Sequence, residues 1–446
     1  MIPTWRLRAA FARRLSDMYG KEVPAYTTLL EVSAHVNDEV IGRGGDAGRL
    51  GGIARVTAER HGAIRVGTPR EMRQAAQIFA ALGMAPVGFY DLREAAPSAV
   101  PVVSTAFRPV DAEELERNPF RVFTSLLATA DRRFFDAELQ GRLEGFLGRR
   151  ELFPPALLEL AAAAERDGGL DEQRAERFLA LAVAAFELSP EPVDRAWYTE
   201  LERISAVAAD VGGVASTHIN HLTPRVLDID ELYRRMAHRG ITMIDRIQGP
   251  PRWDGPDVLL RQTSFRALAE PRRFRERDGS IGEGTLRVRF GEVEARGAAL
   301  TRAGRALYDE LVGEPAERWA ARFPRTERRL AIESLAYFRF EPAVDRPRDG
   351  SRPPDDLAGL LDGGWLSACP IVYEDFLPRS AAGIFQSNLA DEGAHDAFAT
   401  GAHYDQDWLS GVLERPVHDP FDLYAAQQDS SLRQARQGLG LPKDAL

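Results

Sequence analysis

Two stretches of the chain look like copies of one structural unit. The first begins at His61 and reads HGAIRVGTPREMRQAAQIFAALGMAPVGFYDL, and the second begins at His221 and reads HLTPRVLDIDELYRRMAHRGITMIDRIQG. Both open with His-x-x-x-Arg-Val and continue through an acidic helix start, an amphipathic helix, a terminal glycine and an apolar strand. Internal repetition constrains the fold more strongly than any single motif. We expect each copy to be a βαβββ module, and the two sheets to form a cupped, mixed half-barrel of the α+β class.

The pattern of residues around the repeat divides the chain into five parts. Helical periodicity marks the N-terminal region and a long stretch between the two copies, and it mixes with short strands and proline-rich loops near the C-terminus. We therefore expect a large helical insertion and a C-terminal segment that covers a pocket. The expected parts are N-terminal helices at 1–52, the first module at 53–110, the helical insertion at 111–210, the second module at 211–300 and the C-terminal mixed segment at 301–446.

The composition excludes several classes of protein. A net charge of −10 argues against a nucleic acid or an anionic membrane as partner. The longest unbroken apolar run, from Phe178 to Phe186, is much shorter than the ~20 residues that cross a bilayer. The start of the chain lacks an apolar signal core, and the single cysteine, Cys369, excludes an internal disulfide framework. We expect a cytoplasmic protein with a small-molecule partner.

The repeat also places two histidines at equivalent points. Because each copy begins with a histidine, duplication would bring His61 and His221 from facing sheets into one cavity. We expect a third ligand from the strand-like segment FGEVEARG, in which Glu292 and Glu294 are two residues apart and share one face. Two imidazoles and one carboxylate form the facial triad of non-haem Fe(II) oxygenases, and the same set binds catalytic zinc. The residues alone do not choose between the two glutamates.

Another histidine competes for the place in the second copy. His218 and His221 both lie in the segment HINHL, three residues apart, so in a strand their side chains point to opposite faces. The register of the repeat aligns His221, and not His218, with His61. We therefore expect His221 to be the ligand.

Five separated motifs, in order along the chain, resemble those of one known family. They read HGAIRVGT, HINHLTPRVLDID, VLLRQTSF, RFGEVEARGAALT and YEDFLPRSAAGIFQSNL, and the resemblance extends from about Tyr26 to about Leu389. The family is that of the 2-oxoadipate dioxygenases/decarboxylases, or hydroxyglutarate synthases, distant members of the vicinal-oxygen-chelate superfamily. The resemblance implies a cupped sheet of βαβββ modules and an Fe(II) centre. It also implies conversion of 2-oxoadipate and O₂ into 2-hydroxyglutarate and CO₂, in lysine breakdown.

The resemblance further implies roles for individual residues. The family's metal ligands fall on His61, His221 and Glu294, and its substrate-recognising arginine falls on Arg65. Arg65 is four residues from His61, so in an extended strand the two side chains share one face. A planar, permanently charged guanidinium suits a bidentate grip on the distal carboxylate of a 2-oxo dicarboxylic acid. We expect Arg65 to bind the substrate and to take part in catalysis.

Three more residues are expected to line the substrate pocket. By resemblance to the family, backbone groups of Arg379 and Ser380, just before AAGIFQSNL, would help to hold the substrate. A small apolar residue is usual where Arg379 stands, so this long cation is expected to narrow the pocket or to shift the choice of oxo acid. Gln262, in VLLRQTSF, is a pocket candidate of the same kind.

Other functions fit the same scaffold. A glyoxalase-like isomerase, or a hydrolase with zinc as a Lewis acid, would use a similar metal site without consuming O₂. A non-catalytic protein would instead bind a dicarboxylate between the two modules and would need no metal triad. Metal analysis combined with O₂ uptake separates these alternatives from a dioxygenase.

Overall fold

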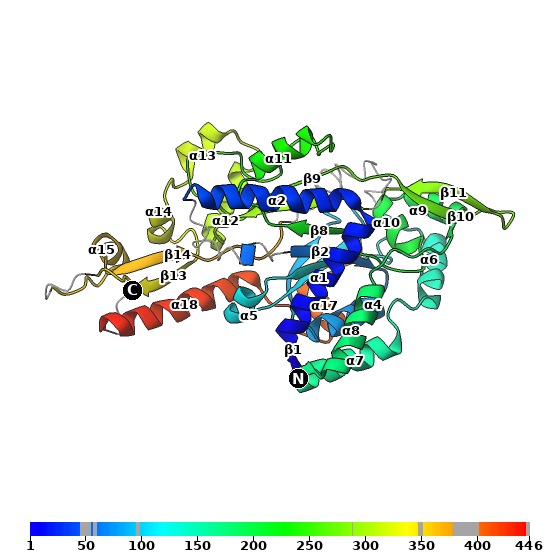
Figure 1. The fold of residues 1–446 in the computed structure, drawn as a ribbon, viewed down its shortest axis with the longest axis horizontal. Helices are drawn as coiled ribbons and strands as arrows, with labels where there is room; N and C mark the ends of the chain where they lie inside the picture. The colour runs from blue at the N-terminus through cyan, green and yellow to red at the C-terminus, as the bar shows by residue number, and fades with distance from the viewer. Residues whose placement is uncertain are drawn as a thin grey trace.

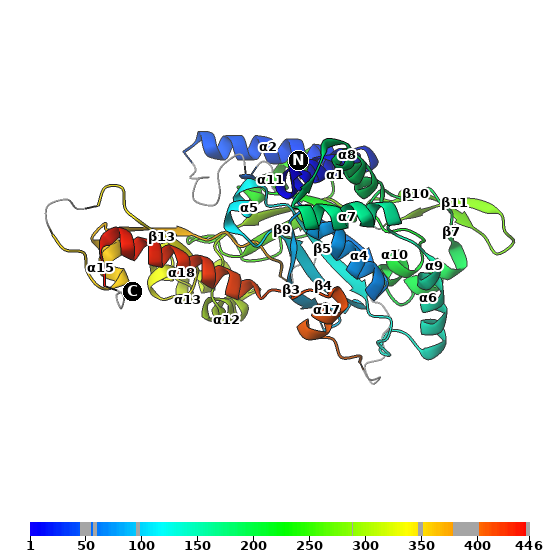
Figure 2. The same ribbon diagram turned by 90° about the horizontal axis from the view of Figure 1, so that it is seen from below.

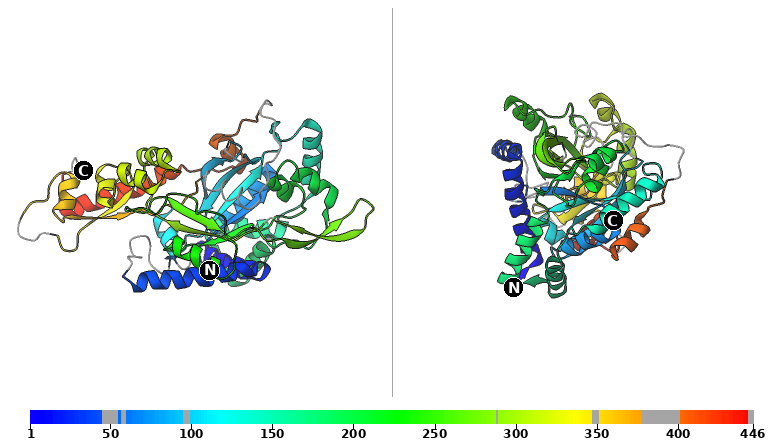
Figure 3. Two further views of the ribbon diagram at one scale, coloured as in Figure 1. Left: turned by 90° about the horizontal axis from the view of Figure 1, so that it is seen from above. Right: turned by 90° about the vertical axis from the view of Figure 1, so that its right-hand side faces the viewer.

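Two long helices lie along one side of the molecule (Figures 1 and 3). The computed structural model describes residues 1–44, 55–56, 60–94, 99–287, 289–346, 351–377 and 401–442. Helix α1 spans Thr4–Glu22 and helix α2 spans Pro24–Gly42, as the periodicity of the N-terminal region predicts. The two helices are separated at Val23, because Pro24 can begin a helix but cannot continue one.

The first copy of the repeat folds as a βαβββ module. Its elements are β2 (Arg60–Val66), α4 (Pro69–Ala80), β3 (Ala85–Asp91), β4 (Val102–Arg108) and β5 (Arg121–Leu127). The strands are ordered β3-β4-β5-β2 in the sheet. Helix α4 begins with a capping box, in which the Thr68 hydroxyl and the Glu71 carboxylate each accept a backbone N–H. Gly83, with a φ of 69°, then turns the chain into β3.

The second copy follows this order, except that isolated bridges take the place of a regular strand directly after its helix. Its elements are β8 (His221–Pro224), α11 (Ile229–His238), β9 (Leu260–Ser264) and β12 (Glu292–Arg296). The segment before β9 pairs with it only through isolated bridges at Met243 and Gln248. Strand β12 pairs antiparallel with β9 and meets the chain just after β8 through a parallel bridge between Arg225 and Glu294. Since β5 lies parallel to β2 in the same way, the duplicated βαβββ architecture expected from the sequence is confirmed.

The two modules meet edge to edge. Strand β8 pairs antiparallel with β2, with Ala63 opposite His221 and His61 opposite Thr223. The sheet therefore runs β3-β4-β5-β2-β8, and the two histidines come from neighbouring strands rather than from the facing sheets that we expected. Residues directly opposite each other share a face, and so do residues two apart along a strand. His61 and His221 consequently lie on the same face of one sheet.

The stretch at 111–210 is only partly helical. Helix α5 (Ala112–Arg117) is followed by β5, so the helix predicted through RVFTSLL was wrong there. All seven residues of β5 are buried, and its aromatic and β-branched side chains suit a central strand. The helices that follow are α6 (Ala137–Arg149), α7 (Pro155–Asp167), α8 (Glu172–Ala184), α9 (Arg195–Glu202) and α10 (Ala206–Gly212). No helix in the described ranges is long and apolar enough to span a membrane.

A β-hairpin projects from one end of the molecule (Figure 1). Strands β10 (Glu270–Arg275) and β11 (Ile281–Leu286) form it, and β10 also pairs with the short strand β7 (Val193–Asp194). The sequence predicts one continuous strand over 285–300, but β11 ends at Leu286 and β12 begins at Glu292. Most residues of the hairpin are at least partly exposed, so no apolar pattern marked its turn. A smaller strand pair joins β1 (Ile2–Pro3) to β6 (Gly169–Leu170).

The C-terminal segment builds a second core at the opposite end (Figures 1 and 2). Its elements are α12 (Arg302–Leu311), α13 (Ala316–Arg322), α14 (Glu327–Ile332), β13 (Phe338–Pro342), α15 (Leu357–Asp362), β14 (Leu366–Pro370) and α18 (Pro420–Leu439). Helix α17 (Gln406–Leu413) instead packs against α4 and β3 of the first module. Trp319 is fully buried in this core, with its ring against those of Tyr308 and Phe323. Helix α18 lies along β13, where the Gln428 side chain accepts a hydrogen bond from the backbone N–H of Phe338.

Candidate metal centre

Two buried imidazoles meet on the face that the two modules share. His61 lies on β2, between β5 and β8, and its side chain is 1% exposed. Its ring meets the His221 ring edge to face, with the ring centroids 5.4 Å apart. Phe376 packs edge to face against His61 at 4.9 Å, and Phe290 stacks on His221 at 5.2 Å. The two histidines that the repeat aligned are therefore together, and aromatic rings shield them from water.

Glu292 completes a cluster with the two histidines. One of its carboxylate oxygens lies 3.2 Å from Nδ1 of His221 and 3.7 Å from Nε2 of His61. One potential ligand atom from each of the three residues lies within 4.8 Å of the others, and all three side chains are buried. Two imidazole nitrogens and a carboxylate oxygen form a donor set that suits Fe(II) or Zn(II). The cluster therefore fits a single metal ion.

The charges around the cluster favour a cation. Burial lowers the pKa of His61, but the carboxylates of Glu294 and Glu292 outweigh burial and hold this pKa above its usual value. Burial lowers the pKa of His221 well below the usual range, so that this imidazole is neutral, as a metal ligand must be. Burial also raises the pKa of Glu292. A site that favours a proton on a buried imidazole has the negative potential that attracts a metal cation.

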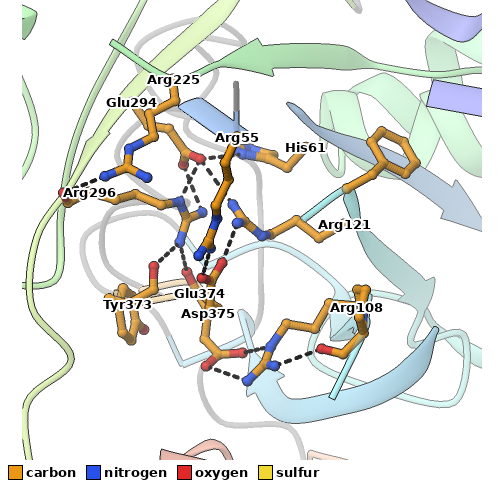
Figure 4. A network of polar contacts seen from close by, with 12 residues as sticks. Arg55, His61, Arg108, Arg121, Arg225, Glu294, Arg296, Tyr373, Glu374 and Asp375 are labelled. Carbon is orange, nitrogen blue, oxygen red and sulfur yellow. Dashed lines mark hydrogen bonds and ion pairs between the residues drawn. The ribbon is translucent and has the colours of Figure 1, made fainter. Parts of the chain in front are cut away.

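Glu294, which we expected to be the third ligand, lies outside this cluster. Strand β12 places Glu292 and Glu294 on the same face, as the sequence predicts, but arginines surround the second carboxylate (Figure 4). Arg296 donates to both of its oxygens, at 2.6 and 2.9 Å, and Arg121 donates at 3.3 Å. Burial raises the pKa of Glu294, but Arg296 and His61 outweigh burial and lower it well below the usual range. The geometry therefore favours Glu292, the alternative that the sequence left open.

Arg65 points along the same face as His61 and is 4% exposed. Its guanidinium pairs with the carboxylate of Asp210 at the end of α10, and its charge helps to lower the pKa of His221. Asp210 also accepts a hydrogen bond from Asn220 at 3.0 Å and lies 3.3 Å from Nε2 of His218. His218 therefore belongs with Asp210 and not with the metal cluster, which agrees with the register of the repeat.

Of the three other residues that we expected in the pocket, the structure describes one. Gln262 is buried on β9 directly opposite Glu294, so its side chain shares the face of the metal cluster. Its backbone pairs with that of Gln248. Arg379 and Ser380 lie outside the described residues.

A buried ion-pair network that we did not expect connects this site to the C-terminal segment (Figure 4). Glu374 accepts hydrogen bonds from Arg121, at 2.5 Å, and from Arg55. Asp375 accepts two from Arg108, at 2.7 and 3.1 Å. Arg296 donates to the backbone carbonyls of residues 373 and 375, at 2.8 and 3.0 Å.

Part of this ion-pair network could have been found from the sequence. The acidic pair at 374–375 lies within YEDFLPRS, one of the motifs that carry the family resemblance. Arg121 was missed because it opens the segment that we expected to be helical, whereas in β5 it lies directly beside His61. Arg296 follows Glu294 by two residues, so the same strand periodicity that joined the two glutamates also places Arg296 on their face.

Known proteins match this chain over nearly its whole length. The family model described as 2-oxoadipate dioxygenase/decarboxylase matches residues 11–388. A 2-oxoadipate dioxygenase/decarboxylase of Mycobacterium tuberculosis is 59% identical over 95% of this chain and 97% of its own. One from Pseudomonas putida is 41% identical, with 98% and 97% covered.

The fold agrees with these sequence relations. The structure of the hydroxyglutarate synthase of Pseudomonas putida in complex with 2-oxoadipate superposes with a TM-score of 0.82, at 39% identity, with 99% of both chains covered. The enzyme class and the family expected from the sequence motifs are confirmed. The chain therefore belongs to the 2-oxoadipate dioxygenase/decarboxylase family.

Proposed function

We propose that this chain converts 2-oxoadipate and O₂ into 2-hydroxyglutarate and CO₂ with Fe(II) held by His61, His221 and Glu292. The observation that carries the proposal is the buried cluster of these three residues in a member of this family. A related enzyme with the same fold is described in complex with 2-oxoadipate. By this proposal, the chain acts in lysine breakdown and works in the cytoplasm.

The residues around the cluster have separable tasks. Bound Fe(II) supplies the activation of O₂ and the coordination of the 2-oxo acid. Arg65 grips the distal carboxylate of the substrate, because its planar guanidinium offers two parallel N–H donors. Asp210 holds Arg65 in place. Phe376 and Phe290 flank the two imidazoles and exclude water from them.

One assay tests this function against its alternatives. Purified protein with added Fe(II) should take up O₂ and release CO₂ with 2-oxoadipate, in an oxygen-electrode experiment with a panel of 2-oxo acids. Zinc in place of iron should give no O₂ uptake. A metal-bound protein that turns over substrate without O₂ would instead be an isomerase or a hydrolase. A protein that binds the acid without turnover would be a dicarboxylate-binding protein.

Replacing Arg65 by lysine should weaken substrate binding more than it slows the reaction. The change keeps the charge but removes the bidentate fork, and a lost charge-assisted hydrogen bond corresponds to a roughly 10- to 100-fold rise in KM. Discrimination between 2-oxo acids of different chain length should also fall. Steady-state kinetics with several acids measure both effects.

A matched control is Arg142→Lys, because Arg142 forms an ion pair with Glu200 on the exposed surface. The control should leave KM unchanged. If Arg65→Lys shows the same kinetics as the control, Arg65 does not bind the substrate.

A further inference from the structure

The imidazole of His61 lies between two carboxylates, each of which faces a different ring nitrogen. Nε2 is 3.7 Å from Glu292, and Nδ1 is 3.1 Å from Glu294. Nδ1 is buried, and no described residue forms a well-aligned hydrogen bond with it. The carboxylate of Glu294, at 3.1 Å, is the acceptor within reach. A histidine that ligates a metal through one ring nitrogen commonly donates the N–H of the other to a carboxylate, which fixes the tautomer and the ring orientation.

The carboxylate of Glu294 is fixed from the other side. Arg296, two residues further along β12, forms two parallel hydrogen bonds with it. Arg121 reaches it from β5, whose pairing with β2 sets Arg121 beside His61. The side chains of all three members of this group are fully buried.

The same contacts exclude Glu294 as a ligand. Both of its oxygens already accept hydrogen bonds from guanidinium groups, and two guanidinium cations this close would repel a divalent metal ion. The oxygen of Glu292, in contrast, is directed to the two histidines. The two glutamates lie on one strand, but their different contacts suit them to different roles.

We propose that Glu294 is a positioning residue, which accepts the Nδ1–H of His61 so that Nε2 carries the lone pair that faces the metal site. Arg121 and Arg296 hold the carboxylate in place and turn it away from the ion. The inference rests on the proposed metal centre, and it adds a residue that acts through His61 rather than on the substrate. It therefore concerns how tightly and in what geometry the metal is held.

Anaerobic titration of the metal-free protein with Fe(II) or Co(II) tests the proposal. Glu294→Gln should still bind one ion but roughly 10- to 100-fold more weakly than wild type, because an amide is a poorer acceptor than a carboxylate. The absorption spectrum of bound Co(II) should shift. Glu292→Gln should lose most of its metal binding.

The matched control is Glu374→Gln, which removes a carboxylate from the same Arg121 without touching His61. It should bind metal within about threefold of wild type. An equal loss in Glu294→Gln and Glu374→Gln would show that only the ion-pair network matters, and would overturn the proposal. So would an unchanged affinity of Glu294→Gln, or a loss as complete as that of Glu292→Gln.

A second measurement needs no substitution at Glu294. Nuclear magnetic resonance of Zn(II)-loaded wild type with ¹⁵N-labelled histidine, assigned with His61→Gln, should show a protonated Nδ1 and a metal-bound Nε2 at His61. The opposite tautomer would overturn the inference even if the Glu294 variant failed to fold. Wild-type protein that binds no metal would overturn the proposed function itself.

Discussion

Replacing His61 by alanine should abolish metal binding and reduce CO₂ release from 2-oxoadipate to background. The imidazole is fully enclosed and supplies one of the three donors of the cluster. His218, the nearby buried histidine, is engaged with Asp210 and not with the cluster. Metal content after anaerobic loading, and CO₂ release from labelled substrate, measure the two effects.

The control for this experiment is His218→Gln, which changes a buried histidine that lies three residues before His221 and outside the cluster. It should retain one metal ion per chain. A fully active His61→Ala enzyme would refute the proposed centre, whereas metal loss in the His218 variant would reopen the choice between the two histidines of HINHL.

Replacing Arg108 by methionine should destabilise the protein by about 3–5 kcal/mol, because it leaves a buried carboxylate without its cation. Arg108 and Asp375 are each 1% exposed and share two hydrogen bonds. After the change, Asp375 would keep only the Tyr424 hydroxyl among its side-chain partners in the described part of the chain. Urea unfolding followed by circular dichroism measures the loss of stability.

The surface pair of Arg142 and Glu200 supplies the comparison. The side chains of Arg142 and Glu200 are 47% and 37% exposed, and a surface ion pair of this kind contributes less than about 1 kcal/mol. Arg142→Met should therefore unfold near the wild-type midpoint. Similar midpoints for the two variants would mean that the Arg108–Asp375 pair does not hold the C-terminal segment in place.

The repeat explains why so much of the fold and site could be predicted. It aligned His61 with His221 without any knowledge of strand order, and the modules then placed both on one face. The choice between Glu292 and Glu294 needed more than periodicity, because a spacing of two residues gives both the same face. What separates them is the pair of arginines that hold Glu294: Arg296 lies on the same strand, but Arg121 reaches Glu294 from β5, a strand distant in sequence.

The strands that were predicted wrongly failed for opposite physical reasons. Strand β5 is buried on both faces, so its sequence, RVFTSLL, shows no regular alternation of apolar and polar residues and is hard to tell from a buried helix. The β10–β11 hairpin shows the reverse problem, because its residues are mostly solvated. The second core around Trp319 could be recognised as mixed helices and strands. No local sequence pattern indicated, however, that residues 373–376 extend from this core back to His61.

Residues 373–376 complete the surroundings of His61, so the site can form only after this late part of the chain has been synthesised. The strand that carries His61 leaves the ribosome early, and Glu292 follows after much of the chain has been made. A nascent chain arrested before residue 373 would carry all three proposed ligands, yet it would lack the acids that pair with Arg108 and Arg121. Maturation of the enzyme is therefore a late event, expected only when translation is nearly finished.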